Sequence, residues 1–300
     1  MKYADKADGP MLVTNGIAGS RRVVGFIVCA TLMFMNVALH GRAYGHGDTY
    51  EKLQRLTQDI SDHPQSADLH RQRGQVHAQH GHWDEAIADY ERAEQLDPEI
   101  KHLDLLLGKA LRKAKRFEEA VSRLDRYIIK YSESPGAYLA RARAHASALS
   151  VDAASADFAK VAKLAPNPDA CVEWATLLVK TNRAAEAIQR LEEGCNALGP
   201  LISLQVKIID IENSRGNYDA ALKRIDAILV NAPRKESGLA RKGDVLARAG
   251  KPSAAADAYM QALVALRRLP SRHRNSAAMQ TLQKSLQQKL GEKKNRTNVQ

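Results

Sequence analysis

Small residues recur along this chain with a spacing of about 34 residues, the length of a short helical repeat. A first column holds glycine, alanine and, once, isoleucine: Gly74, Gly108, Ala142, Ala175, Ile209 and Gly243. A second column holds only alanine: Ala86, Ala120, Ala154, Ala187, Ala221 and Ala255. Two columns that keep one spacing through six copies predict an array of repeated units.

A large hydrophobic residue stands four positions after each of these alanines: Tyr90, Leu124, Phe158, Leu191, Ile225 and Tyr259. Residues four apart share one face of a helix, so both columns point into one seam. Two antiparallel helices approach closely only where a side chain is small. Prolines such as Pro64, Pro98 and Pro166 end units, because proline cannot continue a helix. The pattern therefore predicts a helical hairpin in each unit.

The unit at residues 67–100 carries the fullest pattern: Gly74, Trp83-Asp84-Glu85-Ala86, Tyr90, Ala93 and Leu96-Asp97-Pro98. These residues resemble the tetratricopeptide repeat family, and the resemblance covers about residues 50–290. It implies an all-α, right-handed superhelical solenoid with six helical hairpins over residues 67–268, which binds other proteins and is not an enzyme. Because Ile209 replaces a small residue, we expect the fifth hairpin to pack more loosely.

Both ends of the array are predicted to carry caps, which a solenoid needs for solubility. Residues 46–66 are interpreted as a linker and capping helix, with Leu53, Leu56 and Ile60 on one face. Residues 269–290 are interpreted as a C-terminal capping helix, because Met279, Leu282, Leu286 and Leu290 share a face. Residues 291–300 are polar and basic, which is typical of a disordered tail.

Residues 1–45 are typical of an export signal. Arg21 and Arg22 precede an uncharged apolar run over residues 23–39, and the small residues Ala43 and Gly45 follow. Cleavage before His46 would release a periplasmic or otherwise exported protein. An uncleaved segment would instead anchor it in the inner membrane, since the run is of intermediate length. Either case predicts residues 46–300 on the far side of the membrane, and Met11 is an alternative start.

The net charge of +11 is unevenly distributed. Lysine and arginine gather near the two ends of the chain, and the repeats between them are close to neutral. This argues against nucleic-acid binding, which needs a continuous basic surface. The basic end, residues 267–296, could instead contact anionic lipid or an acidic partner.

No catalytic or nucleotide-binding signature is present in the sequence, and we expect no cofactor. The first helices of such an array line its concave groove, and residues between the seam positions project into it. The candidate groove residues are Arg71, Gln75, Leu105, Lys109, Arg112, Lys113, Arg143, Lys180, Lys207 and Arg241. The middle of this set is basic, which favours an acidic or extended peptide of an envelope protein. The family's clamp for a C-terminal carboxylate is absent, since Leu105 and Leu139 occupy two of its positions.

Four histidines of the first repeat suggest an alternative function. His77, His80 and His82 have a spacing that could reach one metal ion, and His70 lies nearby. The chain would then be a metal-binding or metal-delivery protein. The simpler interpretation places His70 and His77 in the seam and the other two at the turn, which predicts no metal site.

Two cysteines lie in the exported part of the chain, whereas Cys29 lies in the apolar run. Cys171 stands early in the first helix of the fourth repeat and Cys195 late in the second. Antiparallel helices bring such ends together, so an oxidising compartment would permit a disulfide. The alternative is two reduced thiols that pack as small hydrophobic groups.

Overall fold

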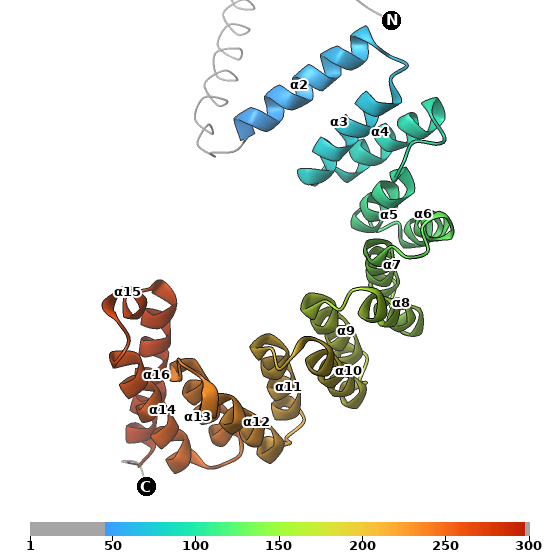
Figure 1. Cartoon of the computed structure of the whole chain (residues 1–300). Coiled ribbons are helices and arrows are strands. Elements are labelled where there is room, and N and C mark those ends of the chain that lie inside the picture. The colour runs from blue at the N-terminus through green and yellow to red at the C-terminus, as the bar shows by residue number, and fades with distance from the viewer. Residues whose placement is uncertain (1–45, 298–300) are drawn as a thin grey trace, which may run out of the picture. The chain divides into compact units, whose positions relative to one another are not determined.

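The structure, a computed structural model, describes residues 46–297, and the predicted export signal lies outside these residues. All regular secondary structure in the described range is helical, as predicted (Figure 1). The chain divides into two compact units, Met1–Pro64 and Gln65–Gln300. The described part of the first unit contains helix α2 (His46–Asp62). This helix lies within residues 46–66, where the sequence predicts a linker and capping helix. No helix in the described range is both long enough and apolar enough to cross a membrane.

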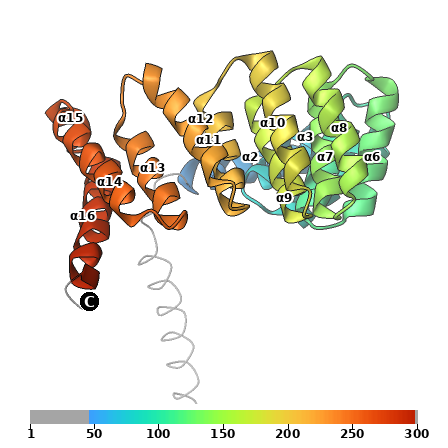
Figure 2. The same ribbon diagram turned by 90° about the horizontal axis from the view of Figure 1, so that it is seen from below.

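The second unit contains six helical hairpins. Their helices are α3 (Ala67–Gln79) and α4 (Trp83–Leu96), α5 (Leu103–Lys113) and α6 (Phe117–Lys130), α7 (Pro135–Ser147) and α8 (Val151–Leu164), α9 (Pro168–Lys180) and α10 (Ala184–Leu198), α11 (Ile202–Ser214) and α12 (Tyr218–Asn231), and α13 (Glu236–Arg248) and α14 (Pro252–Arg267). Within this unit the first helices of the hairpins follow one side of the array (Figure 1), where α5 contacts α3 and α7, and α9 contacts α11. We call this side the first-helix face. Figure 2 shows helices of successive hairpins, such as α7 to α10, side by side in a row.

The two predicted columns meet in the seam of each hairpin. A Cβ at Gly74 would lie 2.7 Å from the ring of Tyr90, and one at Gly108 would lie 2.5 Å from Leu124 Cγ. The alanine column is 0–2% exposed throughout. The small residue therefore leaves the space that the large residue of the second helix fills. This confirms a helical-repeat solenoid.

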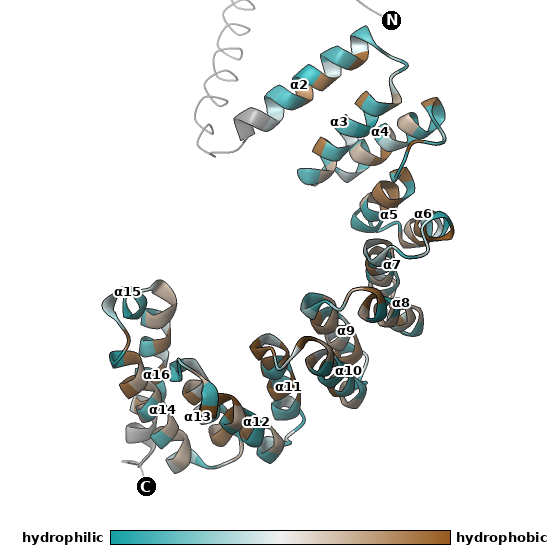
Figure 3. Ribbon diagram, in the orientation of Figure 1, coloured by the Kyte–Doolittle hydropathy of each residue, from teal (hydrophilic) through white to brown (hydrophobic). Residues whose placement is uncertain are grey.

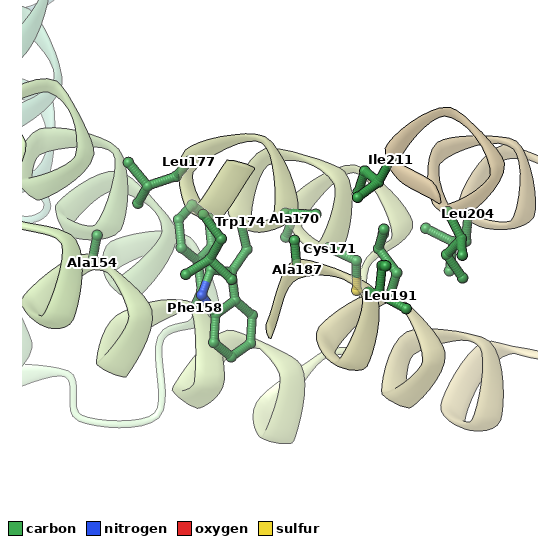
Figure 4. Close-up of a cluster of buried hydrophobic side chains, with 14 of the residues drawn as sticks. Ala154, Phe158, Ala170, Cys171, Trp174, Leu177, Ala187, Leu191, Leu204 and Ile211 are labelled. Atoms are coloured by element: carbon green, nitrogen blue, oxygen red, sulfur yellow. The ribbon is translucent and has the colours of Figure 1, made fainter. Parts of the chain in front are cut away.

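The central hairpins share the largest hydrophobic cluster (Figure 4). The rings of Phe158 and Trp174 stack at 6.0 Å between centroids, which joins α8 to α9. Hydrophobic and hydrophilic residues are both present on every helix of the array, because one face is buried and another meets solvent (Figure 3). In the fifth hairpin Ile209 is buried in the seam at 1% exposure. Fewer residues of α11 and α12 approach each other closely than residues of α3 and α4. Looser packing of the fifth hairpin stays a prediction.

A third column of residues occupies the turn within each hairpin. Its members are Gly81, Lys115, Leu149, Asn182, Gly216 and Gly250, and their φ angles run from 60° to 80°. The left-handed backbone ends the first helix and suits glycine. A side chain in this conformation costs about 1–2 kcal/mol, less for asparagine. Lys115 and Leu149 are therefore strained positions.

Ion pairs join the two helices of some hairpins across the seam, and we call this set the ion-pair ladder. The repeat pattern of the sequence does not predict these pairs. Arg73 on α3 holds both carboxylate oxygens of Asp89 on α4, at 2.7 and 2.9 Å. Arg141 on α7 holds Asp157 on α8 at 2.6 and 2.9 Å and also reaches Asp125 on the preceding α6 at 2.5 Å. Arg141 therefore bonds within its own hairpin and to the neighbouring hairpin.

The C-terminal helices close the last hairpin. Helix α15 (Ser271–Arg274) is a short turn, and α16 (Ala277–Thr297) packs on α14 through Leu286, which is 1% exposed. Leu282 and Leu290 join the same cluster, consistent with the predicted capping face. The helix continues past Gly291, where the sequence pattern favoured a disordered tail.

Candidate protein-binding face

Four of the predicted groove residues surround one open pocket of about 790 Å³ on the first-helix face. Arg112 and Lys113 come from the end of α5, Arg143 from α7 and Lys180 from the end of α9. These positions are close because α5, α7 and α9 belong to three successive hairpins. We call this the basic pocket.

Hydrophobic side chains form the floor and one edge of the basic pocket. Phe158, Leu177 and Val172 are buried or half-buried in its lining. Leu149, from the turn between α7 and α8, stands at its edge and is 71% exposed. The pocket thus combines a cationic rim with an apolar interior.

The positive charges of this region are incompletely neutralised. Arg143 forms a two-pronged ion pair with Glu173 on α9, with both distances 2.7 Å. Arg112 and Lys109 form no ion pair within the described part of the chain. Burial, and then repulsion from Arg143, lowers the pKa of both side chains. Glu173 attracts Arg112 more weakly, but neither cation is in an ion pair, so both would gain from a bound carboxylate.

The other predicted groove residues lie away from the basic pocket. Arg71 pairs with Asp68 on its own helix at 2.5 Å, and Arg241 pairs with Asp210 on α11. Leu105 packs on the cluster around Tyr127 and belongs partly to the core. The remaining three are Gln75 on α3 and Lys207 on α11, both half-buried, and Lys109 on α5, which is exposed and outside the pocket lining. The structure therefore brings together the middle of the predicted set and not its ends.

The histidine cluster belongs to the seam of the first hairpin. His70 is 8% exposed, and its Nδ1 lies 3.4 Å from Oδ1 of Asp89, the carboxylate that Arg73 already holds. His80 and His82 flank the turn between α3 and α4, as predicted. Among the described residues, no group of three or more His, Cys, Asp or Glu side chains is placed to hold a metal ion. The geometry gives the metal-binding alternative no support.

His77 makes the first hairpin sensitive to acid. Burial lowers the pKa of its imidazole below the ordinary value; the charge of Asp89 opposes this lowering in part, and the charge of Arg73 adds to it. The unfolded chain therefore takes up this proton at a higher pH than the folded chain. Stability should be complete above about pH 6.5 and should fall as the pH drops below it, through the lowered pKa. In His77→Gln the dependence of the unfolding midpoint on pH should be weaker in this window.

Urea unfolding between pH 7.5 and 5 checks this expectation, with His63→Gln at an exposed histidine as control. Equal slopes for His77→Gln and the unchanged protein would contradict it.

Cys171 and Cys195, the two cysteines of the described range, are free thiols in this structure, and a disulfide between them in an oxidising compartment stays a prediction. The Sγ of Cys171 would lie 2.9 Å from a Cβ at Gly194, inside the hydrophobic cluster next to Leu191 (Figure 4). The next residue, Cys195, projects about 100° further around α10. Its Sγ accepts a hydrogen bond from Gln205 Nε2 at 3.3 Å. Burial raises the pKa of both thiols, which favours the uncharged thiol over the reactive thiolate.

Comparison by sequence agrees with this helical-repeat solenoid. The tetratricopeptide repeat matches residues 67–100, 105–170 and 213–272. The chain belongs to the tetratricopeptide repeat family. No curated protein matches it by sequence.

Solved structures share the fold. A tetratricopeptide repeat protein from Parabacteroides merdae aligns with 77% of this chain and 89% of its own, at 16% identity and a TM-score of 0.50. A structure of Naa15/Naa10 bound to HypK-THB aligns with 80% of this chain and 38% of the other, at 16% identity and a TM-score of 0.50. At this identity the likeness shows the fold alone.

Proposed function

We propose that this chain is an exported, non-catalytic scaffold that binds an acidic protein or peptide segment on its first-helix face. The observation that carries the proposal is the basic pocket. Cations from three successive hairpins surround it, Glu173 is the one carboxylate in its lining, and Arg112 forms no ion pair among the described residues. A rigid array presents such a surface without reorganising, which lowers the entropic cost of binding.

Each residue group has a separate role in this binding. Arg112 and Lys180 meet carboxylates of the partner, while Phe158 and Val172 provide an apolar surface. Charge complementarity sets which partner is chosen and raises the association rate. The solved assembly with HypK-THB is a protein complex built on the same fold.

Charge reversal in the basic pocket tests this role. In the triple variant Arg112→Glu and Lys180→Glu in the pocket lining, with Lys109→Glu beside Arg143, we expect partner affinity to fall at least tenfold, equivalent to about 1.4 kcal/mol or more. Affinity purification from the protein's own cell envelope, with quantitative mass spectrometry, measures the loss. The matched control reverses Lys130, Lys163 and Lys223, which are exposed on the second helices α6, α8 and α12.

Partners that are lost from the pocket variant and retained by the control support the proposal. Partners retained equally by both variants would contradict it. The purified variants should also show equal helix content by circular dichroism, because all six positions lie outside the core.

We propose export on the sequence of residues 1–45, which the described range does not include. Cell fractionation followed by N-terminal sequencing of the purified protein tests it. A mature chain in the envelope that begins at His46 indicates a cleaved signal, and a full-length chain in the membrane fraction indicates an anchor. Recovery of the protein in the cytoplasmic fraction would contradict export.

A further inference from the structure

Leu149 combines two unfavourable features at one surface position. Its φ of 60° places a branched side chain in the left-handed region, where the equivalent turns use Gly81, Gly216 or Gly250. Its side chain is also 71% exposed, although it is hydrophobic. Glycine would remove both features without disturbing the core. A strained and exposed residue of this kind points to a surface role.

The position of Leu149 indicates which surface it serves. It lines the basic pocket at the open edge of the apolar floor formed by Phe158, Val172 and Leu177. A large apolar group bound on this floor would contact Leu149 on one side and cover it from water. The burial of both surfaces would favour binding.

The charges around the floor restrict what can accompany that apolar group. Arg112 and Lys113 approach from α5 and Lys180 from α9. Glu173 accepts hydrogen bonds from two of the three guanidinium nitrogens of Arg143 and would repel a carboxylate placed beside it. Carboxylates of a ligand would therefore pair with Arg112 and Lys113 at the end of α5 and with Lys180 at the end of α9.

We infer that the basic pocket selects a peptide segment with a large apolar side chain between acidic residues, and that Leu149 is its apolar specificity residue. The inference rests on the proposed function, since it specifies the ligand of the same pocket. It commits to a linear acidic peptide, because the pocket is open and its cations come from three successive hairpins, which an extended chain can follow.

Two synthetic peptides test the inference by fluorescence anisotropy with the full chain. The first is Asp-Glu-Asp-Phe-Glu-Asp-Glu with a terminal fluorophore, and the second has alanine in place of phenylalanine. The unchanged protein should bind the phenylalanine peptide about tenfold more tightly. Leu149→Gly should bind the phenylalanine peptide severalfold more weakly and the alanine peptide as before. It should also raise the urea midpoint of unfolding, because the turn strain is relieved.

Lys115→Gly is the matched control, since Lys115 occupies the equivalent turn of the second hairpin, with a φ of 65°, outside the pocket lining. It should raise the midpoint and leave both affinities unchanged. Leu149→Gly should thus be more stable and yet bind the phenylalanine peptide more weakly. A variant that only lost folding would be less stable, so the two explanations are distinguished.

Arg112→Glu distinguishes this inference from the proposed function. If Arg112→Glu loses both peptides while Leu149→Gly keeps full preference for phenylalanine, the apolar specificity is wrong and the acidic groove stands. If Arg112→Glu binds both peptides as the unchanged protein does, the acidic groove itself is wrong. Equal affinity of the unchanged protein for the two peptides would also overturn the inference.

Discussion

Arg141→Leu should lower the free energy of unfolding by about 3–5 kcal/mol, the usual cost of leaving one partner of a buried ion pair uncompensated. The carboxylate of Asp157 is 6% exposed and receives two hydrogen bonds from Arg141. This pairing raises the pKa of Arg141, so the arginine stays charged. Without it, Asp157 would remain desolvated in the seam of the third hairpin.

Urea unfolding followed by circular dichroism measures this loss. The double variant Arg141→Leu and Asp157→Leu should recover most of the stability, because a hydrophobic pair of similar volume often replaces a buried ion pair without loss. Lys130→Ala, which removes a solvent-exposed pair with Glu99, should change stability by less than about 1 kcal/mol. A small effect of Arg141→Leu alone would show that water reaches Asp157.

Gly74→Ala should destabilise the protein by about 1–3 kcal/mol, the cost of overpacking a filled seam. The added Cβ would lie 2.7 Å from the ring of Tyr90 and 3.1 Å from the carbonyl oxygen of Ala86. The ring cannot move away easily, since Tyr90 is 1% exposed and enclosed by the hairpin. The two helices would have to separate.

The same substitution at Gly136 should have the opposite sign. Gly136 lies in α7 with no atom within 4 Å of an added Cβ. Alanine there should stabilise by up to about 1 kcal/mol, because it restricts the unfolded chain and favours the helix. Thermal unfolding of both variants is the measurement. Destabilisation by both would mean that the loss at Gly74 reflects glycine replacement in general and not the close approach in the seam.

The architecture could be predicted from the sequence because the seam between two helices limits the size of the side chain at particular repeat positions. Gly74 and Tyr90 carry that constraint, and every hairpin repeats it except the fifth, where Ile209 replaces the small residue. The short helix α15 could not be predicted, since four residues carry no periodicity. The continuation of α16 past Gly291 also differs from the sequence expectation, because a polar segment can remain helical without a buried face.

The ion-pair ladder could not be predicted from the same columns. Position 89 holds aspartate, whereas the equivalent position of the second repeat holds Arg123, which instead pairs with Glu94 and Asp104. The charge type thus changes between copies, and the partners lie on different helices. A single sequence shows which repeat positions keep the same side-chain size. It does not show which charged side chains pair with each other.

The basic pocket could be predicted in part. Regular spacing on the first helices identified Arg112 and Arg143, but the ion pair between Arg143 and Glu173 joins residues from two hairpins. Leu149 was missed because an exposed hydrophobic turn residue follows no helical pattern. The glycines at equivalent turns were the available signal, since they mark the backbone conformation that Leu149 shares.

Site-specific photo-cross-linking tests the central claim, that the basic pocket is the partner-binding surface. A photoreactive amino acid replaces Ser147, which is exposed in the pocket lining, or Ser122, which is exposed on the second helix α6. Both proteins are irradiated in the native cell envelope, and cross-linked peptides are identified by mass spectrometry. We expect cross-links from position 147 to one acidic segment that contains a large apolar residue, and none to that segment from position 122. Cross-linking to the same segment from both positions, or from position 122 alone, would contradict the claim.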